Sequence, residues 1–320
     1  MTTCRQMSPV SMLLAFLGGC TAQQYAEMMV APPTTNGRVR QWLLGTGEQL
    51  LQQGRIDEHL RIPVRDMTEL DVWIIRDRRR RRALRDHPGQ VPPTRGTAVV
   101  IHGVLDSKAR FFGFAQALAN RGFDVVLFDH RAHGRSEGTF ITYGAKERYD
   151  VRDLVTSLTG RGAMEGPMYA FGFSMGAATA LEYAAMDSRC RGVMAASPYA
   201  DLEQMTARMA WWLSESRRAE VLAEAGRLAG FDPGDVSPRR AAARLEVPLL
   251  VLHGRLDHTV PYAQGKAVYA AARCPKQMIT VPLAGHVSLV AGRDAWLADR
   301  FVEMTLIGGK GAENEETDNS

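Results

Sequence analysis

Cysteine is scarce in this sequence, with four residues among 320, and none of them stands at a spacing typical of metal ligands. No glycine-rich phosphate loop or dinucleotide-binding fingerprint follows an apolar strand, and no internal repeat is visible. We therefore predict neither a metal nor an organic cofactor, and we exclude repeat architectures.

The sequence also lacks an apolar run long enough to cross a membrane, because Val10 to Leu17 is far shorter than the roughly 20 residues that a spanning helix needs. A basic residue before this run and small residues after it are typical of a secretory signal over residues 1–19. Leu17-Gly18-Gly19-Cys20 resembles the signal box of bacterial lipoproteins, which implies lipidation of Cys20 and an anchor in the cell envelope, with Thr21 compatible with the outer membrane. The alternative is a mis-assigned start and a cytoplasmic protein.

Positive charge is concentrated in one segment of the chain. The formal net charge is +4, and Arg76, Arg78 to Arg82 and Arg85 lie together between two predicted strands. Such a run is typical of a solvated loop, and contact with anionic lipid headgroups is the alternative. We predict no nucleic-acid binding, because the run has no interleaved aromatic residues and no binding module is recognisable.

Apolar residues make up 45% of the chain, enough to bury a large core, and short apolar strands alternate with helical segments through its middle. This alternation predicts an α/β fold with a mostly parallel, eight-stranded sheet covered by helices on both faces. Only Asp66-Met67-Thr68 separates the first two strands, so we expect an antiparallel hairpin there. The expected strands lie near 60–65, 70–75, 97–101, 123–128, 168–172, 192–196, 248–252 and 278–282, and the expected helices near 108–121, 144–160, 175–186, 263–272 and 291–304.

Gly172-Phe173-Ser174-Met175-Gly176 stands between an apolar strand and a helix rich in small residues. A sharp turn from strand to helix leaves its central residue at the carboxyl edge of the sheet in strained geometry, which flanking glycines make sterically possible. This context favours a serine nucleophile at Ser174. The backbone N–H of Met175, at the positive end of the new helix, is expected to face an oxygen that becomes negative during acyl transfer.

Three further polar motifs follow predicted strands, one before Ser174 in the chain and two after it. His102-Gly103-Val104 lies upstream of the serine, and Asp257 and then His286 lie downstream, each after its own strand. With these motifs the chain resembles the α/β-hydrolase family over residues 56–306, and within it the esterase, lysophospholipase and serine-aminopeptidase-like group. The segment Asp129 to Gly138 resembles the loop after strand four of that group, with alanine at position 132 where glycine is usual.

The resemblance implies a catalytic triad and an oxyanion hole. We expect Ser174 to be the nucleophile, His286 the general base and Asp257 the acid that orients the imidazole. The backbone N–H groups of Val104 and Met175 would bind the oxyanion. Asp201, after the sixth strand, is the rival for the acid. The family's strand order does not place Cys190 and Cys274 side by side, so we expect no disulfide between them.

The expected domain organisation has five parts. After the signal at 1–19 come a tether and an amino-terminal helix over 20–55, with Val39, Trp42, Leu43, Leu50 and Leu51 at helical spacing. The hydrolase domain covers 56–307, with a cap insertion at 201–244, and an acidic tail at 308–320 is expected to be disordered. Within the cap, helical spacing suggests that one face lines a substrate pocket, formed by Met205, Met209 and Trp212. The alternative is that these side chains pack the cap onto the body.

Three functions fit these features. The first is hydrolysis of a carboxylic ester or lipid through an acyl-enzyme intermediate, without a cofactor. The second is amide or aminopeptidase activity with the same triad, which needs an acidic group in the cap to bind a substrate ammonium. A non-catalytic lipoprotein that binds partners is the third, and the complete triad counts against it. The candidate acidic residues are Glu203, Glu215, Glu220 and Glu224.

Overall fold

The computed structural model describes residues 20–31, 47–87 and 89–307. The expected signal at 1–19 and the expected tail at 308–320 lie outside the described residues. No helix in the described ranges is both long and apolar enough to span a bilayer.

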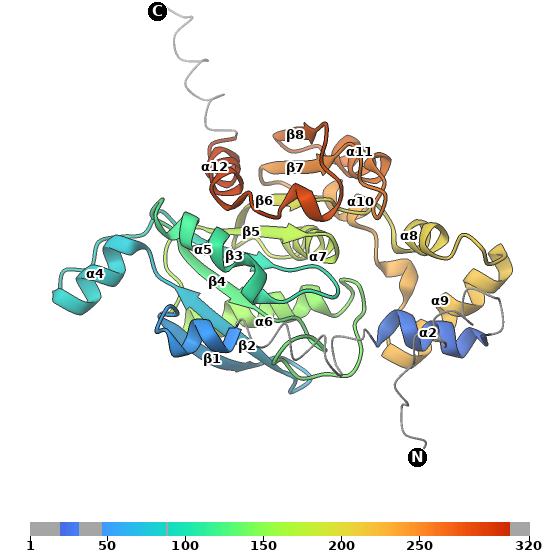
Figure 1. Ribbon diagram of the computed structural model, residues 1–320, viewed down its shortest axis with the longest axis horizontal. Coiled ribbons are helices and arrows are strands. Elements are labelled where there is room, and N and C mark those ends of the chain that lie inside the picture. The colour runs from blue at the N-terminus through green and yellow to red at the C-terminus, as the bar shows by residue number, and fades with distance from the viewer. Residues whose placement is uncertain (1–19, 32–46, 88, 308–320) are drawn as a thin grey trace, which may run out of the picture.

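An eight-stranded sheet organises the molecule, with the order β1-β2-β4-β3-β5-β6-β7-β8. β2 runs antiparallel to both of its neighbours, β1 and β4, and every other adjacent pair is parallel. All eight predicted strands, the mostly parallel sheet and the hairpin at its edge are therefore confirmed (Figure 1). The bounds are β1 Glu58–Pro63, β2 Glu69–Ile75, β3 Thr97–Ile101, β4 Asp124–Phe128, β5 Met168–Phe173, β6 Cys190–Ala196, β7 Leu249–Gly254 and β8 Lys276–Val281.

Helices cover both faces of this sheet, because successive strand residues point to opposite faces. On β3, Val99 and Ile101 join the core under α6, α7, α10 and α11, whereas Ala98 and Val100 join the core under α5 and α12. Both faces of the central strands are apolar, as a parallel sheet between two helical layers requires. The helices are η2 Lys108–Phe111, α5 Phe112–Ala119, α6 Glu147–Gly160, α7 Met175–Ala184, α11 Tyr262–Ala271 and α12 Asp294–Met304.

The expected cap is a small group of helices at the carboxyl edge of the sheet. It contains α8 Leu202–Met209, α9 Glu215–Ala229, η3 Pro233–Asp235 and α10 Pro238–Ala242. A helix not predicted from the sequence, α2 (Ala22–Val30), begins with a capping box between Thr21 and Gln24 and packs against α9. Of the expected amino-terminal helix, 47–52 is helical with Leu50 and Leu51 against the core, and residues 39–46 lie outside the described ranges.

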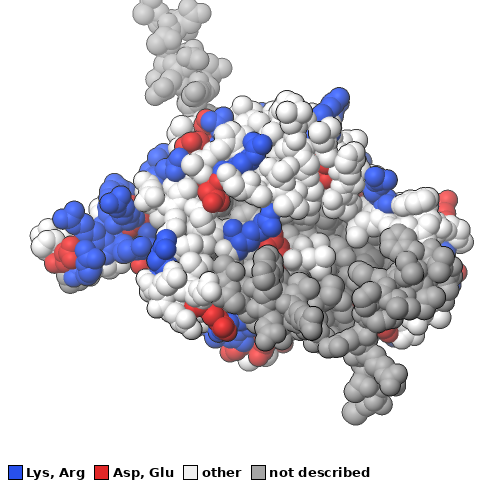
Figure 2. Space-filling view, viewed as in Figure 1, with Lys and Arg blue, Asp and Glu red and all other residues white. Residues whose placement is uncertain are grey.

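The basic segment forms a helix, so the expectation of a solvated loop was wrong. α4 (Arg78–Asp86) is capped at its amino end by Asp77, whose side chain accepts a hydrogen bond from the Arg79 N–H. Figure 2 shows Lys and Arg gathered on this helix, which projects at the opposite end of the molecule from the cap. Nearby carboxylates offset much of this charge, through the pairs Arg79–Asp77, Arg81–Asp57, Arg82–Asp86 and Arg85–Asp86.

Two arginines of this segment are buried around Asp124, at the start of β4. The Asp124 carboxylate lies 3.0 Å from Arg76 Nη1 and 3.3 Å from Arg80 Nε, and it accepts a hydrogen bond of 2.8 Å from the Asp77 N–H. Asp124 has no exposed surface. This cluster therefore joins the segment between β2 and β3 to the sheet.

We predict that Asp124→Ala destabilises the fold by about 3–5 kcal/mol, because it removes the buried carboxylate that two buried guanidinium groups share and leaves them only the more exposed Glu58 and Glu165. The free energy of unfolding in urea measures the effect. Asp86→Ala is the control, since it removes a carboxylate from exposed ion pairs on the same helix and is expected to cost less than about 1 kcal/mol. Equal losses in the two variants would contradict the structural role assigned to Asp124.

Candidate active site

Ser174 lies at the turn between β5 and α7, with a backbone φ of 56° and ψ of −119°. This is the strained geometry expected from the sequence. The glycines on either side have no room for a side chain: a Cβ on Gly172 would lie 2.1 Å from the carbonyl oxygen of Gly176, and one on Gly176 would lie 2.1 Å from that of Ile101. Close backbone packing therefore holds the turn and presents the Ser174 hydroxyl at the start of α7.

Loops after the last two strands bring Asp257 and His286 to this hydroxyl. Nε2 of His286 lies 3.0 Å from Ser174 Oγ, and Nδ1 lies 2.8 Å from Asp257 Oδ2. When Nδ1–H donates to the carboxylate, Nε2 carries the lone pair that can accept the hydroxyl proton. The three predicted residues thus form one hydrogen-bonded line.

The Asp257 carboxylate has further donors besides His286. Its Oδ1 accepts from the N–H groups of Thr259 (3.0 Å) and Val260 (2.8 Å), and its Oδ2 accepts from the Ser197 hydroxyl (2.9 Å). Burial opposes the charged form, but the hydrogen bond and charge of His286, aided by these donors, outweigh it and lower the pKa of Asp257. The site therefore keeps this carboxylate ionised next to the imidazole.

Two further residues, Ser197 and His253, lie next to Asp257. Ser197, directly after β6, was not predicted, and the only available signal was a polar residue at the carboxyl end of a buried strand. His253 shapes the loop after β7, because its Nε2–H donates to the Val260 carbonyl at 2.9 Å; the same nitrogen lies 3.6 Å from Asp257 Oδ2.

The rival acid, Asp201, is bonded elsewhere. Its carboxylate accepts hydrogen bonds from the Ser237 hydroxyl and from Arg239 Nε, the latter at 3.1 Å. These contacts join the first residue of the cap to residues 237–239, where the chain returns from the cap to the body. The geometry therefore favours Asp257 over Asp201 as the partner of His286.

The loop after β3 approaches Ser174 through Gly103, where a Cβ would lie only 3.2 Å from Ser174 Cβ. His102 fixes this loop, because its Nδ1–H donates to the Gly103 carbonyl (2.7 Å) and its Nε2 accepts from the His130 N–H (3.0 Å). Burial and the neighbouring histidines lower the pKa of His102 well below its usual value. The ring is therefore neutral, as these two bonds require.

The two N–H groups predicted for the oxyanion hole flank this contact. Since a trans peptide is planar, a fixed Gly103 carbonyl also fixes the Val104 N–H on the opposite side of the same peptide. Among the described residues, no acceptor is bonded to the N–H of Val104 or of Met175. Both donors therefore remain available to a substrate oxygen that binds next to the Ser174 hydroxyl.

Asp129 holds the neighbouring loop, within the segment Asp129 to Gly138. Its carboxylate accepts from the N–H groups of Lys108 (2.9 Å) and Arg135 (3.0 Å) and pairs with the Lys108 ammonium. Burial opposes its ionisation, yet the Lys108 charge prevails and lowers the pKa of Asp129. Ala132, which replaces the usual glycine, has a positive φ of 59°, the backbone region that glycine enters most easily.

The three residues expected to line a pocket have different surroundings. Met205 is buried in an apolar cluster that also contains Met175, whereas Met209 is 54% exposed. α8 ends at Met209, so Trp212 does not continue its face and packs with α2 and α9 instead. Met29 of α2 also packs against the cluster around Met175, a neighbour not predicted from the sequence.

The described cysteines are Cys20, Cys190 and Cys274, and each is a free thiol. In the part of the chain that the structure describes, no group of three or more His, Cys, Asp or Glu side chains is placed to hold a metal ion. The lipid anchor expected on Cys20 depends on residues 1–19, which are outside the described ranges.

Comparisons with known proteins agree with this architecture. The esterase Pf2001 of Pyrococcus furiosus superposes with a TM-score of 0.62 at 22% identity, covering 79% of this chain and 92% of the esterase. Est1E of Butyrivibrio proteoclasticus, solved with ferulic acid, gives a TM-score of 0.61 at 17% identity, covering 77% and 98%. The protein has the α/β-hydrolase fold. Residues 92–227 match the family model described as serine aminopeptidase, S33.

Sequence relatives of this chain include proteins without an assigned function. YqkD of Bacillus subtilis is an uncharacterized protein, 28% identical over 58% of this chain, and the match spans 63% of YqkD. YfhR of Escherichia coli, also uncharacterized, is 25% identical over 74% of this chain and 75% of its own length. A monoacylglycerol lipase of Mycolicibacterium smegmatis is 29% identical over 53% of this chain and 72% of the lipase.

We predict that Gly176→Ala lowers the free energy of unfolding by about 1–3 kcal/mol or more, because the new Cβ forces α7 away from the end of β3. Urea denaturation provides the measurement. Gly160→Ala is the control, since a Cβ there meets nothing within 4 Å. A Gly176 variant as stable as this control would refute the close packing of the turn.

Proposed function

We propose that the protein is a serine hydrolase that cleaves carboxylic esters through an acyl-enzyme intermediate. The observation that supports it most strongly is the hydrogen-bonded line from Ser174 through His286 to Asp257. A strained serine beside two unoccupied N–H groups is the arrangement that acyl transfer requires.

In this mechanism Ser174 Oγ attacks the carbonyl carbon of the ester while its proton moves to His286 Nε2. Asp257 stabilises the imidazolium and keeps Nδ1–H directed toward itself. The negative carbonyl oxygen accepts hydrogen bonds from the Val104 and Met175 N–H groups, each worth about 2.7–4 kcal/mol in the transition state. His286 then protonates the leaving alcohol, and water deprotonated by the same imidazole releases the acid.

Ester cleavage is preferred over aminopeptidase activity because of the chemistry of the cap. An aminopeptidase needs a carboxylate for the substrate ammonium, but Glu220 and Glu224 are paired with Arg217 and Arg227. The remaining candidates, Glu203 and Glu215, are exposed in the first turns of their helices. The partly buried side chains packed on the cluster around Met175 are apolar and suit an acyl group: Met29, Val104 and Phe231.

We predict that Ser174→Ala lowers ester turnover by at least about 1,000-fold, because removing the nucleophile leaves only binding and oxyanion stabilisation. A panel of p-nitrophenyl esters of increasing chain length, run beside aminoacyl p-nitroanilides, measures the activity. A fluorophosphonate probe should label the parent and the control Ser216→Ala, an exposed cap serine, but not Ser174→Ala. Unchanged ester turnover in Ser174→Ala rejects the assignment, and faster turnover of the anilides favours the aminopeptidase.

A second prediction separates the two candidate acids. Asp257→Asn should lower kcat by about 1,000- to 10,000-fold, because an amide no longer holds the catalytic tautomer of His286. Asp201→Asn should keep kcat within about threefold, since Asp201 contacts Ser237 and Arg239 rather than the imidazole. Initial rates on one ester compare the two variants, and the reverse order of losses would assign the acid to Asp201.

The membrane anchor also remains a proposal. Cys20 is partly buried beside the cap, and its carbonyl accepts a hydrogen bond of 3.2 Å from Arg217 Nη2. Acyl chains on this residue would hold the cap side of the enzyme near a bilayer. Intact-mass measurement on the membrane fraction tests the modification, and Cys20→Ala should abolish it.

A further inference from the structure

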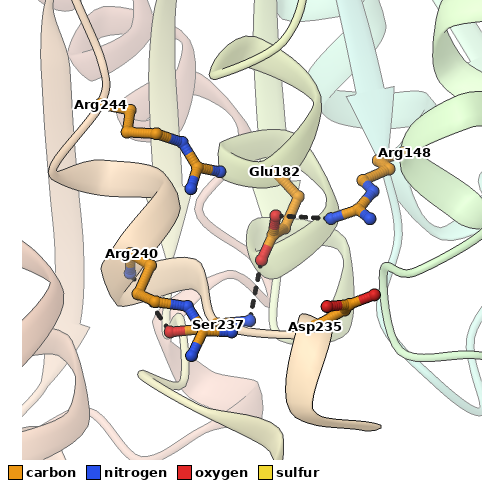
Figure 3. A pocket seen from close by; sticks show the side chains of 6 residues that line it. All are labelled: Arg148, Glu182, Asp235, Ser237, Arg240 and Arg244. Atoms are coloured by element: carbon orange, nitrogen blue, oxygen red, sulfur yellow. Dashed lines mark hydrogen bonds and ion pairs between the residues drawn. The ribbon is translucent and has the colours of Figure 1, made fainter. Parts of the chain in front are cut away.

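A polar cavity of about 290 Å³ lies where the segment returning from the cap meets the body. It is separate from the Ser174 hydroxyl and is formed by α6, α7, η3 and α10 with the residues after α10. Figure 3 shows its walls, which contain no apolar side chain: Arg148, Glu182, Asp235, Ser237, Arg240 and Arg244. An acyl chain would gain nothing from such a lining, so the cavity fits a polar ligand.

Glu182 forms the inner wall and is already satisfied. It is buried, and it accepts hydrogen bonds from Arg148 Nη1 (3.0 Å) and from the Ser237 N–H (2.9 Å). Arg148 Nε, by contrast, is buried without a hydrogen-bond partner among the described residues. A buried guanidinium N–H without an acceptor is costly, and it marks a position for an oxygen atom.

Arg240 and Arg244 give the cavity lining a net positive charge. Arg240 donates to the carbonyl of Gly234, and both arginines are solvent-exposed, with no ion pair within 4 Å among the described residues. Burial raises the pKa of Glu182, and the charges of Arg148 and Arg244 oppose this rise. With Glu182 and Asp235 ionised, the lining carries three positive and two negative charges. An anion bound beside Arg240 and Arg244 would be attracted by this excess of positive charge.

We propose that this cavity binds a phosphate group, carried by a small phosphorylated molecule or by a lipid headgroup. The two guanidinium groups without carboxylate partners match a dianion, and their planar forks suit phosphate oxygens. The unpaired Nε of Arg148 supplies a further donor.

Such a ligand would join the cap to the body. Arg148 and Glu182 belong to α6 and α7, whereas Arg240 and Arg244 belong to the segment that leaves the cap. The same segment is tied to the first cap residue, because Ser237 and Arg239 both bond Asp201. Phosphate bridging the two sides therefore stabilises the folded cap through its base.

Isothermal titration calorimetry with inorganic phosphate and with glycerol 3-phosphate tests the proposal on the purified chain, in buffer held at constant ionic strength with potassium chloride. We expect saturable binding that weakens at least about tenfold in Arg240→Gln/Arg244→Gln, since the double substitution removes two charge-assisted donors to the anion. Asp235→Asn should tighten binding several-fold, because it removes a negative charge from the lining. Arg227→Gln, an exposed arginine on α9, is the control and should leave the affinity within about twofold.

Vesicles of phosphatidic acid, compared with phosphatidylcholine, distinguish the two sources of phosphate. Sedimentation with phosphatidic acid alone that is lost in Arg240→Gln/Arg244→Gln assigns a headgroup, and binding of the soluble probes assigns a free phosphate compound. Circular dichroism and the urea midpoint of unfolding measured without phosphate, which these substitutions should not change, show that the variants fold. The proposal is overturned if neither probe nor vesicle binds the parent, or if the double variant binds as well as the parent.

Discussion

The close approach of α7 to the end of β3 is the constraint on which the site depends. Without side chains at Gly172 and Gly176, the first turn of the helix lies against the Ile101 carbonyl. The same contact puts Ser174 in its strained conformation and leaves the Met175 N–H at the free start of the helix. Strain at one residue is tolerable because two core clusters and the sheet hold everything around it.

Buried charges hold the loops around this contact. Asp129 and Asp71 both pair with the Lys108 ammonium, and Asp129 also binds the backbone of the loop that follows β4. An isolated buried carboxylate would take up a proton, whereas these are kept ionised by the opposite charge at their side. The loop with the Val104 N–H therefore lies between two fixed neighbours, His102 with its two hydrogen bonds and the Lys108 network.

Local patterns predicted the strands and the turn at Ser174, whereas the roles of Asp257 and His286 were implied by the resemblance to the α/β-hydrolase family. Buried strands read as short apolar runs, and the carboxyl ends of parallel strands meet at one edge, so motifs at that edge converge whatever their separation in the chain. Ser197 and the bonds of His253 could not be predicted in this way, because they depend on which side chain faces Asp257 across two loops. The loop predicted for the arginine run failed for a related reason: Asp124 lies 48 residues from Arg76, and only the fold shows that the two are paired.

α2 could not be predicted for the same reason, because its role depends on contacts with residues far away in the chain. Its residues pack against α9, the Val30 carbonyl accepts from the Ile141 N–H at 2.8 Å, and the Met29 carbonyl accepts from the Tyr143 hydroxyl at 2.8 Å. α2 thus connects the cap to the body on one side, while the arginine-lined cavity at α10 lies at the cap's other attachment. Under the proposed ester hydrolysis, substrate selection is expected to depend on the packing of Met29 and Met205 near Met175, the residue that follows Ser174.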